Sequence, residues 1–414
     1  MLKAWFEVKL WKRILSALVL GVIVGLIWGD GAESIRWIGD VFVRLIRMLV
    51  VPLIFTTLVA GVVSMGEPKR LGSIGVRAFS LYLLTTAAAI VIGLVMGIIL
   101  QPGAGVDLSG ATARDLGPAM SVAERLYAVI PTNPIAALAE GNILAIILFA
   151  ILVGLGIVLS GAKAKVLGET FNAAADVMLK ITFLVMELAP FGVFALIAWV
   201  SGTQGVATLA NIFVLAVAVY IGCFVHMVLV YGGVVKFICR LPLMPFIRGA
   251  VDPQLVAYST SSSAATLPAT MAASEENHGV GTPVSSSVIP LGATVNMDGT
   301  ALYVGIVALF TAQAFGISLT MSDYLIIGLT TTLVSIGTAS VPSASLFLLA
   351  AVLESIGVSG AQTAIIVGFI LPFDRVLDMM RTVVNVTGDL TVSLTVAKFE
   401  HELDEGKYRA RPKI

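Results

Sequence analysis

Charged residues are scarce in this sequence of 414 residues, since Asp, Glu, Lys and Arg together make up only 12% of it. An ordinary soluble domain carries about 25%. Hydrophobic residues make up 58%, so a water-soluble fold would lack the polar surface to cover its core. A soluble protein is therefore excluded, and the composition predicts a polytopic membrane protein. The 25 basic and 25 acidic residues cancel, which argues against a nucleic-acid partner, because such proteins carry a basic surface.

Cysteine is also rare. Cys223 and Cys239 are the two in the chain, and both lie in or beside apolar runs, which argues against a disulfide framework and a metal cluster. Basic residues precede the first apolar run, as in a secretory signal peptide, but no small-residue cleavage site follows. We therefore interpret this run as a retained first span.

Long apolar runs are abundant instead, and about 20 apolar residues suffice for a helix to cross the hydrocarbon core. The expected crossings lie at about 14–29, 37–63, 78–100, 135–160, 174–200, 208–235, 283–315 and 360–397. With the N-terminus inside, most Lys and Arg residues fall in cytoplasmic segments, as the positive-inside rule requires. The sequence predicts eight crossings of a cell (inner) membrane, with both termini in the cytoplasm.

Two further apolar segments are interrupted by small polar residues. The segment 251–271 is broken at 259–263, and the segment 325–353 is broken at 335–343. Each half is too short to span, so we expect each segment to enter and leave the membrane on one side. Each is followed by a crossing helix, and this pair of inverted repeats indicates the binding site of a secondary transporter.

The last crossing carries polar residues along one face. At 100° per residue, seven of them share an arc of about 120°. They are Asp374, Arg375, Asp378, Arg381, Thr382, Asn385 and Asp389. Five charges facing lipid would cost on the order of 12–18 kcal/mol, so this face is expected to point into the protein or a watery site.

The charges on the last two crossings do not balance. With Asp298 of the seventh crossing, four carboxylates oppose the two guanidinium groups and leave a charge of −2. Buried uncompensated charge is costly, so cations are expected, and hard oxygen donors suit an alkali ion. An internal salt-bridge network that only locks helices together is the alternative. The segment Asn296–Thr300, NMDGT, favours local unwinding that frees carbonyl groups for such an ion.

Four motifs together resemble the sodium-coupled glutamate/aspartate transporter family, also called the dicarboxylate/amino acid:cation symporters. They are NMDGT at 296–300, SIGTASVP at 335–342, TSSSAATLP at 260–268 and DMMRTVVNVTGD at 378–389. The resemblance runs along essentially the whole chain. It implies a homotrimer in which a scaffold holds a mobile transport domain that carries substrate and sodium across the bilayer in an elevator motion.

The resemblance and the apolar runs together imply a division of the chain. Spans 1 and 2 (1–77) and spans 4 and 5 (119–207) form the scaffold. The transport domain comprises span 3 with an outer loop (78–118), span 6 (208–250), the first re-entrant hairpin (251–282), span 7 (283–320), the second hairpin as extracellular gate (321–358) and span 8 (359–397). Residues 398–414 are expected to be a solvated cytoplasmic tail.

The resemblance also implies which residues bind. Asp378 would bind the substrate ammonium and Arg381 its side-chain carboxylate. Further substrate contacts would come from Thr300, Thr382, Asn385, Ser262, Ser263 and Val341. One sodium site would use Asp389, Asn385, Asn296 and Gly292, a second Met297, Thr294, Ser335, Ile336 and Thr338, and a third Asp298, Asn296, Tyr82, Thr85 and Thr86.

The sequence departs from the archaeal members at the first hairpin tip, where Thr260 or Ser261 stands in place of an arginine, and Arg375 is expected to take that electrostatic role. A proton-coupled carrier, or one for neutral amino acids or dicarboxylates, remains the alternative, with anion conduction as a side activity. An intramembrane aspartyl protease lacks support because no Gly-x-Gly-Asp motif is present, so we expect no enzyme. The histidines, His226, His278 and His401, are expected to take no part in a site.

Overall fold

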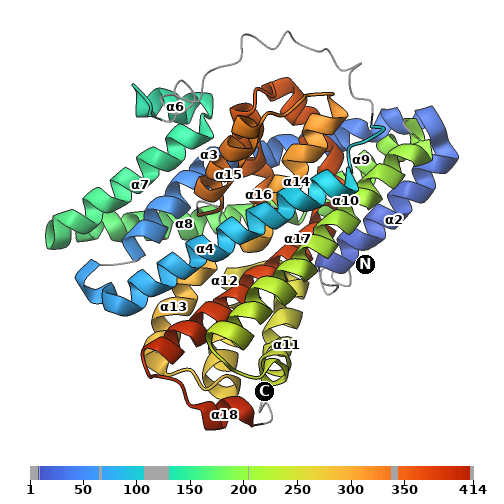
Figure 1. Cartoon of the computed structure of the whole chain (residues 1–414). Coiled ribbons are helices and arrows are strands. Elements are labelled where there is room, and N and C mark those ends of the chain that lie inside the picture. The colour runs from blue at the N-terminus through green and yellow to red at the C-terminus, as the bar shows by residue number, and fades with distance from the viewer. Residues whose placement is uncertain are drawn as a thin grey trace.

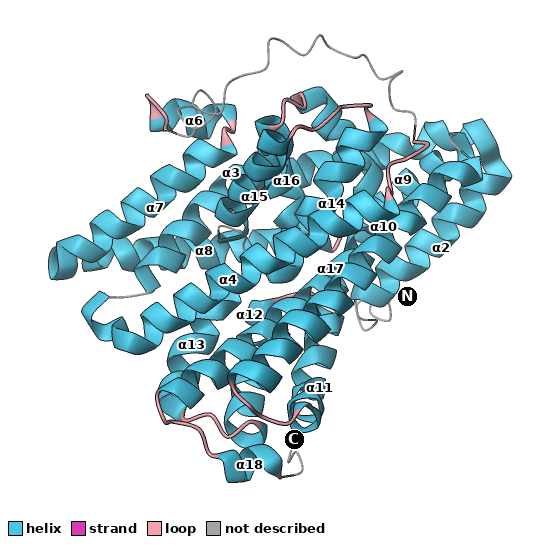
Figure 2. Ribbon diagram, viewed as in Figure 1, coloured by secondary structure: helices cyan, strands magenta, loops and turns pink. Residues whose placement is uncertain are grey.

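The structure is a computed structural model that describes residues 8, 10–64, 68–106, 130–203, 205–336 and 344–410. Every regular element in these ranges is a helix, as the composition predicts (Figure 2). Five helical stretches of this part are long and apolar enough to cross a membrane. They are Lys12–Leu45, Ser73–Leu100, Ala145–Met186, Ala210–Ile238 and Thr282–Ala314.

The first helices of the chain pack on one another through close backbone contacts. Their bounds are α2 (Leu10–Trp28), η1 (Gly29–Ile35), α3 (Arg36–Ser64), α4 (Pro68–Leu100), α6 (Pro134–Glu140), α7 (Ile143–Ser160), η2 (Gly161–Ala164), α8 (Lys165–Met186) and α9 (Ala189–Thr203). Helix α2 lies along α9, and α3 packs against α7, α8 and α9 (Figure 1). A Cβ at Gly25 would lie 2.1 Å from Ser201 Oγ, so glycine allows α2 and α9 to approach this closely.

The stretch 174–200, expected to form one crossing, is not one continuous helix, because two helices occupy it. Helix α8 ends at Met186 and α9 begins at Ala189. Pro190 stands in the first turn of α9, where its missing N–H costs nothing, whereas inside a continuous helix it would remove a hydrogen bond.

The helices of the second half of the chain pack around two of their number, α14 and α17. Its elements are α10 (Gly205–His226), η3 (Met227–Tyr231), η4 (Val234–Ile238), α11 (Leu243–Thr260), α12 (Ser263–Ala272), η5 (Ala273–Asn277), α13 (Thr282–Val295), α14 (Asp298–Ala314), α15 (Met321–Ile336), α16 (Ala344–Ser355), α17 (Gly360–Phe399) and α18 (Glu405–Arg409). Every residue of α14 except Gln313 is buried. Helix α17 contacts α11, α13 and α14, and α4 lies along α14.

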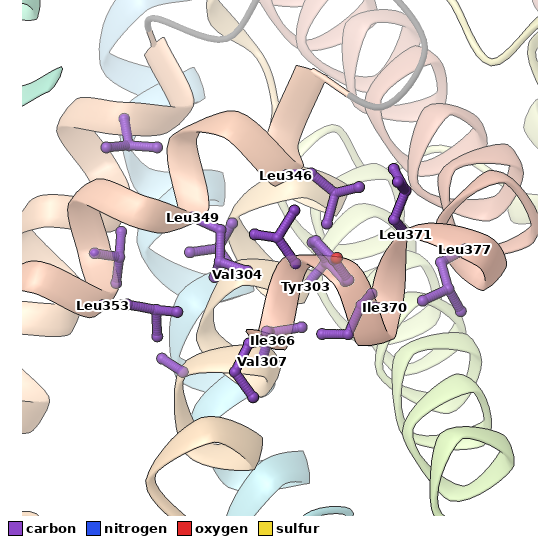
Figure 3. Close-up of a cluster of buried hydrophobic side chains, with 14 of the residues drawn as sticks. Tyr303, Val304, Val307, Leu346, Leu349, Leu353, Ile366, Ile370, Leu371 and Leu377 are labelled. Atoms are coloured by element: carbon purple, nitrogen blue, oxygen red, sulfur yellow. The ribbon is translucent and has the colours of Figure 1, made fainter. Parts of the chain in front are cut away.

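An apolar cluster joins α14, α16 and α17. Side chains of Tyr303, Val304 and Val307 on α14 meet leucines of α16 and residues of α17 (Figure 3). The α16 and α17 members shown are Leu346, Leu349, Leu353, Ile366, Ile370, Leu371 and Leu377. This packing fixes α14 relative to α17. The polar face of α17 adjoins the cluster at Tyr303, over whose ring Arg381 lies.

The predicted interruptions appear as breaks between helices. Helix α11 ends at Thr260, and α12 begins at Ser263 after Ser261 adopts a left-handed φ of 51°. The predicted unwinding of NMDGT is confirmed, since α13 ends at Val295 and α14 begins at Asp298. In the second interrupted segment α15 ends at Ile336 and α16 begins at Ala344, and the tip at 337–343, with Thr338 and Val341, lies outside the described residues.

Most of residues 402–408 are exposed, as expected of a solvated tail, but the segment also docks on the rest of the protein at defined points. The backbone N–H of Gly281 donates to Glu402 O (2.8 Å), and that of Asp404 donates to Gly279 O (2.8 Å). Tyr408 is fully buried and its hydroxyl donates to Pro242 O (2.8 Å). The aromatic ring and the backbone pairing therefore attach the tail to the base of α11 and the start of α13.

Candidate functional site

The polar face of α17 points into the protein, as its helical periodicity predicts. All seven members of the predicted arc are buried, and none is more than 7% exposed. Because α17 stays α-helical over 40 residues, spacing of three and four residues keeps these side chains on one side. Asp298, the fourth carboxylate in the sum, is also fully buried at the start of α14. The charge imbalance expected from the sequence therefore lies inside the protein.

Arg381 occupies the centre of this face. Its Nη2 donates to Asp378 Oδ1 (2.8 Å) and lies 3.0 Å from Asp374 Oδ1. The guanidinium carbon lies 4.0 Å from the ring centroid of Tyr303, which favours the cation through the π face. Its Nε and Nη1 are buried and have no hydrogen-bond partner in the described part of the chain. Arg381 therefore keeps donors for a further carboxylate.

Arg375 connects α17 to the break between α11 and α12. Its Nη2 donates to the backbone oxygen of Thr260 (3.1 Å), the last residue of α11. Ser262 caps α12 by accepting from Ala265 N (3.2 Å), and Ser262 and Ser263 are both buried. The serines thus stand at a helix N-terminus, where backbone N–H groups favour an anion.

Asp389 lies beside the break in NMDGT. Asn296 Nδ2 donates to Asp389 Oδ1 and to Asn385 O, both at 2.9 Å. Asn296 Oδ1 is buried and has no hydrogen-bond partner among the described residues. A Cβ at Gly292 would lie 2.3 Å from both Asp389 Oδ1 and Tyr82 OH. Oxygen atoms of Asp389 and Tyr82 therefore lie close together where Gly292 has no side chain. Beside them, Asn385 Oδ1 accepts from Gly299 N (2.8 Å).

Asp298 has a different set of neighbours. Thr86 on α4 donates to its Oδ1 (2.6 Å), and Tyr231 OH donates to its Oδ2 (2.8 Å). His226 Nε2 lies 3.3 Å from the same Oδ2. His226, which is expected from the sequence to take no part in a site, therefore lies against one of the predicted site carboxylates. The sequence reasoning also missed Tyr231, which is fully buried here.

The other predicted residues take varied positions. Tyr82 OH donates to Val288 O (3.0 Å) and Thr85 Oγ1 to Tyr82 O (3.1 Å), which keeps both beside the two carboxylates. Met297 Sδ accepts from Asn385 Nδ2 (3.2 Å) at the break. The hydroxyl groups of three further residues donate to backbone oxygens of their own helices, and these residues are Thr294, Ser335 and Thr382. Thr300 is buried.

Known proteins resemble the chain along nearly all of its length. The profile of the Sodium:dicarboxylate symporter family matches residues 10–399. A proton/glutamate-aspartate symporter of Escherichia coli (strain K12) is 36% identical over 95% of this chain and 94% of its own. A proton/sodium-glutamate symport protein of Bacillus subtilis (strain 168) is 37% identical with the same coverage of both chains. A C4-dicarboxylate transport protein of that Bacillus strain is 32% identical over 95% of this chain and 94% of its own.

Proposed function

Because the chain belongs to the sodium:dicarboxylate symporter family, we propose that it imports an acidic amino acid, L-aspartate or L-glutamate, together with sodium ions. The observation that carries this proposal is the pairing of Arg381 with Asp378 on one buried face of α17. An acidic amino acid presents both a carboxylate and an ammonium group, and this face presents the complement of each.

The substrate follows from this pair of charges. Arg381 keeps donors for the side-chain carboxylate, and Asp378 would accept the ammonium group. A neutral amino acid would leave those donors unpaired, and a dicarboxylate without an amine would face the Asp378 charge. The α-carboxylate would lie near Ser262 and Ser263 at the start of α12. Thr300, Thr382, Asn385 and Val341 would complete the contacts.

Sodium coupling follows from the charge that remains. An acidic amino acid adds a charge of −1 to a buried site that already holds −2, so its burial requires cations. The cluster of Asp389, Asn385, Asn296 and Gly292 supports one ion, since Asn296 Oδ1 has no donor among the described residues. We place the second ion at Met297, Thr294, Ser335, Ile336 and Thr338, and the third at Asp298 with Asn296, Tyr82, Thr85 and Thr86.

The proposal includes an elevator mechanism with eight crossings and two re-entrant hairpins. The α11–α12 pair would be the first hairpin and α15–α16 the second, with α4, α10, α13, α14 and α17 in the mobile domain. Helices α2, α3, α7, α8 and α9 would form the scaffold of a homotrimer in the inner membrane, with both termini in the cytoplasm. The separate packing of α2 with α9 and of α4 with α14 supports this division.

A proton-coupled carrier is the second candidate, because the Escherichia coli relative is named a proton/glutamate-aspartate symporter. The buried carboxylates could bind protons in place of sodium. The C4-dicarboxylate relative keeps dicarboxylates as alternative substrates. Anion conduction would be a side activity of either carrier.

Uptake into proteoliposomes tests the proposal. Purified protein is reconstituted, and labelled aspartate uptake is measured under an inward sodium gradient, a proton gradient or a potassium gradient alone. We expect accumulation with sodium, competition by glutamate, and weak competition by serine and succinate. Accumulation driven by the proton gradient without sodium would establish the second candidate instead.

A further inference from the structure

The helix after α10 changes its hydrogen-bonding pattern at the level of Asp298. Residues Met227–Tyr231 form a π-helical turn, η3, which begins directly after His226. On an α-helix, residues five apart are separated by about 140°, so His226 and Tyr231 would face different neighbours. The π pattern bonds residue i to i+5 and brings such positions onto one side, and these turns occur frequently at functional sites.

Both side chains use this turn to reach one carboxylate oxygen. Tyr231 OH donates to Asp298 Oδ2 at 2.8 Å, and His226 Nε2 lies 3.3 Å from that oxygen. The two rings meet edge to face with centroids 4.6 Å apart. Thr86 holds the other oxygen, Oδ1, from α4. Because all four residues are buried, the carboxylate has a fixed orientation between α4 and η3.

Gly388 makes room for this arrangement on α17. A Cβ at Gly388 would lie 2.5 Å from Tyr231 OH and 2.5 Å from Asn296 Nδ2. Gly388 directly precedes Asp389, so the Tyr231 hydroxyl lies beside the residues of two proposed sodium sites. The Tyr231 hydroxyl and the Asn296 amide, which both sites share, therefore both lie next to Gly388.

We propose that Tyr231 and His226 are positioning residues of the cation site at Asp298. They hold the Asp298 carboxylate so that one side of it faces the incoming sodium ion. The π turn brings both side chains to this carboxylate. The inference rests on the proposed function, because it assigns residues to a site of that symporter. Loss of an outer partner of a metal ligand typically weakens metal binding by about 10- to 100-fold.

The test measures how aspartate uptake into proteoliposomes depends on sodium concentration. Tyr231→Phe removes the donor and keeps the ring, so half-maximal uptake should need about 10- to 100-fold more sodium. The aspartate KM at saturating sodium should stay within about twofold, since no contact to the substrate is lost. Tyr220→Phe is the matched control, because Tyr220 lies on α10 and its hydroxyl donates to Val376 O (2.8 Å), away from Asp298. It should keep the wild-type sodium dependence.

A second pair of variants separates positioning from general packing. His226→Gln keeps a side-chain N–H donor and should retain near-wild-type sodium dependence, whereas His226→Leu should shift it in the same direction as Tyr231→Phe. If the Tyr231→Phe protein does not accumulate in membranes, the comparison of His226→Gln with His226→Leu tests the positioning role instead. Equal effects of Gln and Leu would overturn the positioning role of His226.

Asp298→Asn separates the failure of this inference from that of the proposed function. If Asp298→Asn raises the sodium concentration for half-maximal uptake and Tyr231→Phe does not, the inference is overturned and the symporter proposal stands. If wild-type uptake needs no sodium, both are overturned. A shift in Tyr231→Phe alongside an unchanged Tyr220→Phe supports the inference.

Discussion

Two regions of this molecule bury helices in different ways. In the N-terminal region, made of α2, α3, α8 and α9, helices approach through glycines such as Gly25 and Gly192. In the central region, made of α13, α14 and α17, the buried groups include Asp298, Arg381 and Asp389. Both regions come from one apolar sequence, so burial alone does not distinguish a structural helix from a functional one.

The position of the charges distinguishes them. Arg13 in the N-terminal region is buried, but it lies near the start of α2 and donates to both oxygens of Glu187 (2.7 and 3.2 Å). Glu187 is 38% exposed and lies between α8 and α9. In the central region the charges lie within α17 and at the start of α14, and their sum is negative. An unbalanced buried sum, and not the mere presence of charge, therefore marks the site.

The largest expected effect comes from Arg381→Ala in the central region. Truncating one member of a buried charge pair costs about 2–5 kcal/mol, or about 30-fold to several thousand-fold in affinity. We expect kcat/KM for aspartate to fall by at least about 30-fold, and the ratio of serine to aspartate uptake to rise. Competition assays in proteoliposomes measure the ratio.

Arg36→Ala is the control for this change, because Arg36 lies in the N-terminal region and stacks over Trp199. It should leave the aspartate-to-serine ratio unaltered. A variant Arg381→Ala that still prefers aspartate over serine would remove the assigned role of Arg381.

Two glycine substitutions with equal steric conflict should have different consequences. A Cβ at Gly292 would lie 2.3 Å from Asp389 Oδ1, and one at Gly25 would lie 2.1 Å from Ser201 Oγ. Overpacking costs about 1–3 kcal/mol at either position. Gly292→Ala should raise the sodium concentration for half-maximal uptake by about 5- to 100-fold. Gly25→Ala should instead lower the melting temperature and leave sodium dependence unchanged.

Gly368→Ala on α17 is the matched control for both, since a Cβ there meets nothing within 4 Å. Should Gly25→Ala shift sodium dependence as far as Gly292→Ala does, the two regions would not be functionally separate.

Sequence periodicity predicted the central region well for a physical reason. Helix α17 keeps α-helical geometry throughout, so a spacing rule placed Asp378, Arg381 and Asp389 on one buried face. The polar run at NMDGT predicted the break between α13 and α14 because its residues favour unwinding. Both signals are local in the chain.

The remaining features depend on geometry that the same rules do not contain. His226 and Tyr231 meet through a π turn, which a period of 3.6 residues places on different faces. The end of α8 falls beside Glu187 and Pro190, which interrupt a mostly apolar run, and a rule based on the length of that run does not use them. Docking of Tyr408 at Pro242 joins positions far apart in sequence, which local pattern cannot detect.

A smaller effect is expected from Glu187→Gln in the N-terminal region. The change replaces the carboxylate that accepts from Arg13 Nη1 and Nη2 with a neutral amide, and because Glu187 is partly exposed, water screens the loss. We expect a destabilisation of about 1–2 kcal/mol, visible as a lower melting temperature. The aspartate KM and the sodium dependence should not move. A changed KM would show that this ion pair communicates with the central region.

The smallest effect is expected outside both regions, at Glu405 in the tail. Hydrogen bonds with Lys398 and Arg409 hold the pKa of Glu405 below its ordinary value of 4.5. A lowered carboxyl pKa stabilises the docked tail above pH 4.5, and this contribution is lost as the pH falls through the lowered pKa. Because the pair is exposed, Glu405→Gln should speed proteolysis of the tail at neutral pH by less than about fivefold.

This difference between Glu405→Gln and wild type should shrink in high salt, which screens exposed charges. It should also vanish in acid, where the wild-type carboxylate is protonated, and limited proteolysis across a pH series measures it. A difference that grows toward low pH would contradict the sign of the pKa shift. A loss of aspartate uptake in Glu405→Gln would contradict the comparison between the two kinds of charge. It would mean that an exposed, balanced ion pair matters for transport as much as the buried, unbalanced charges of α14 and α17.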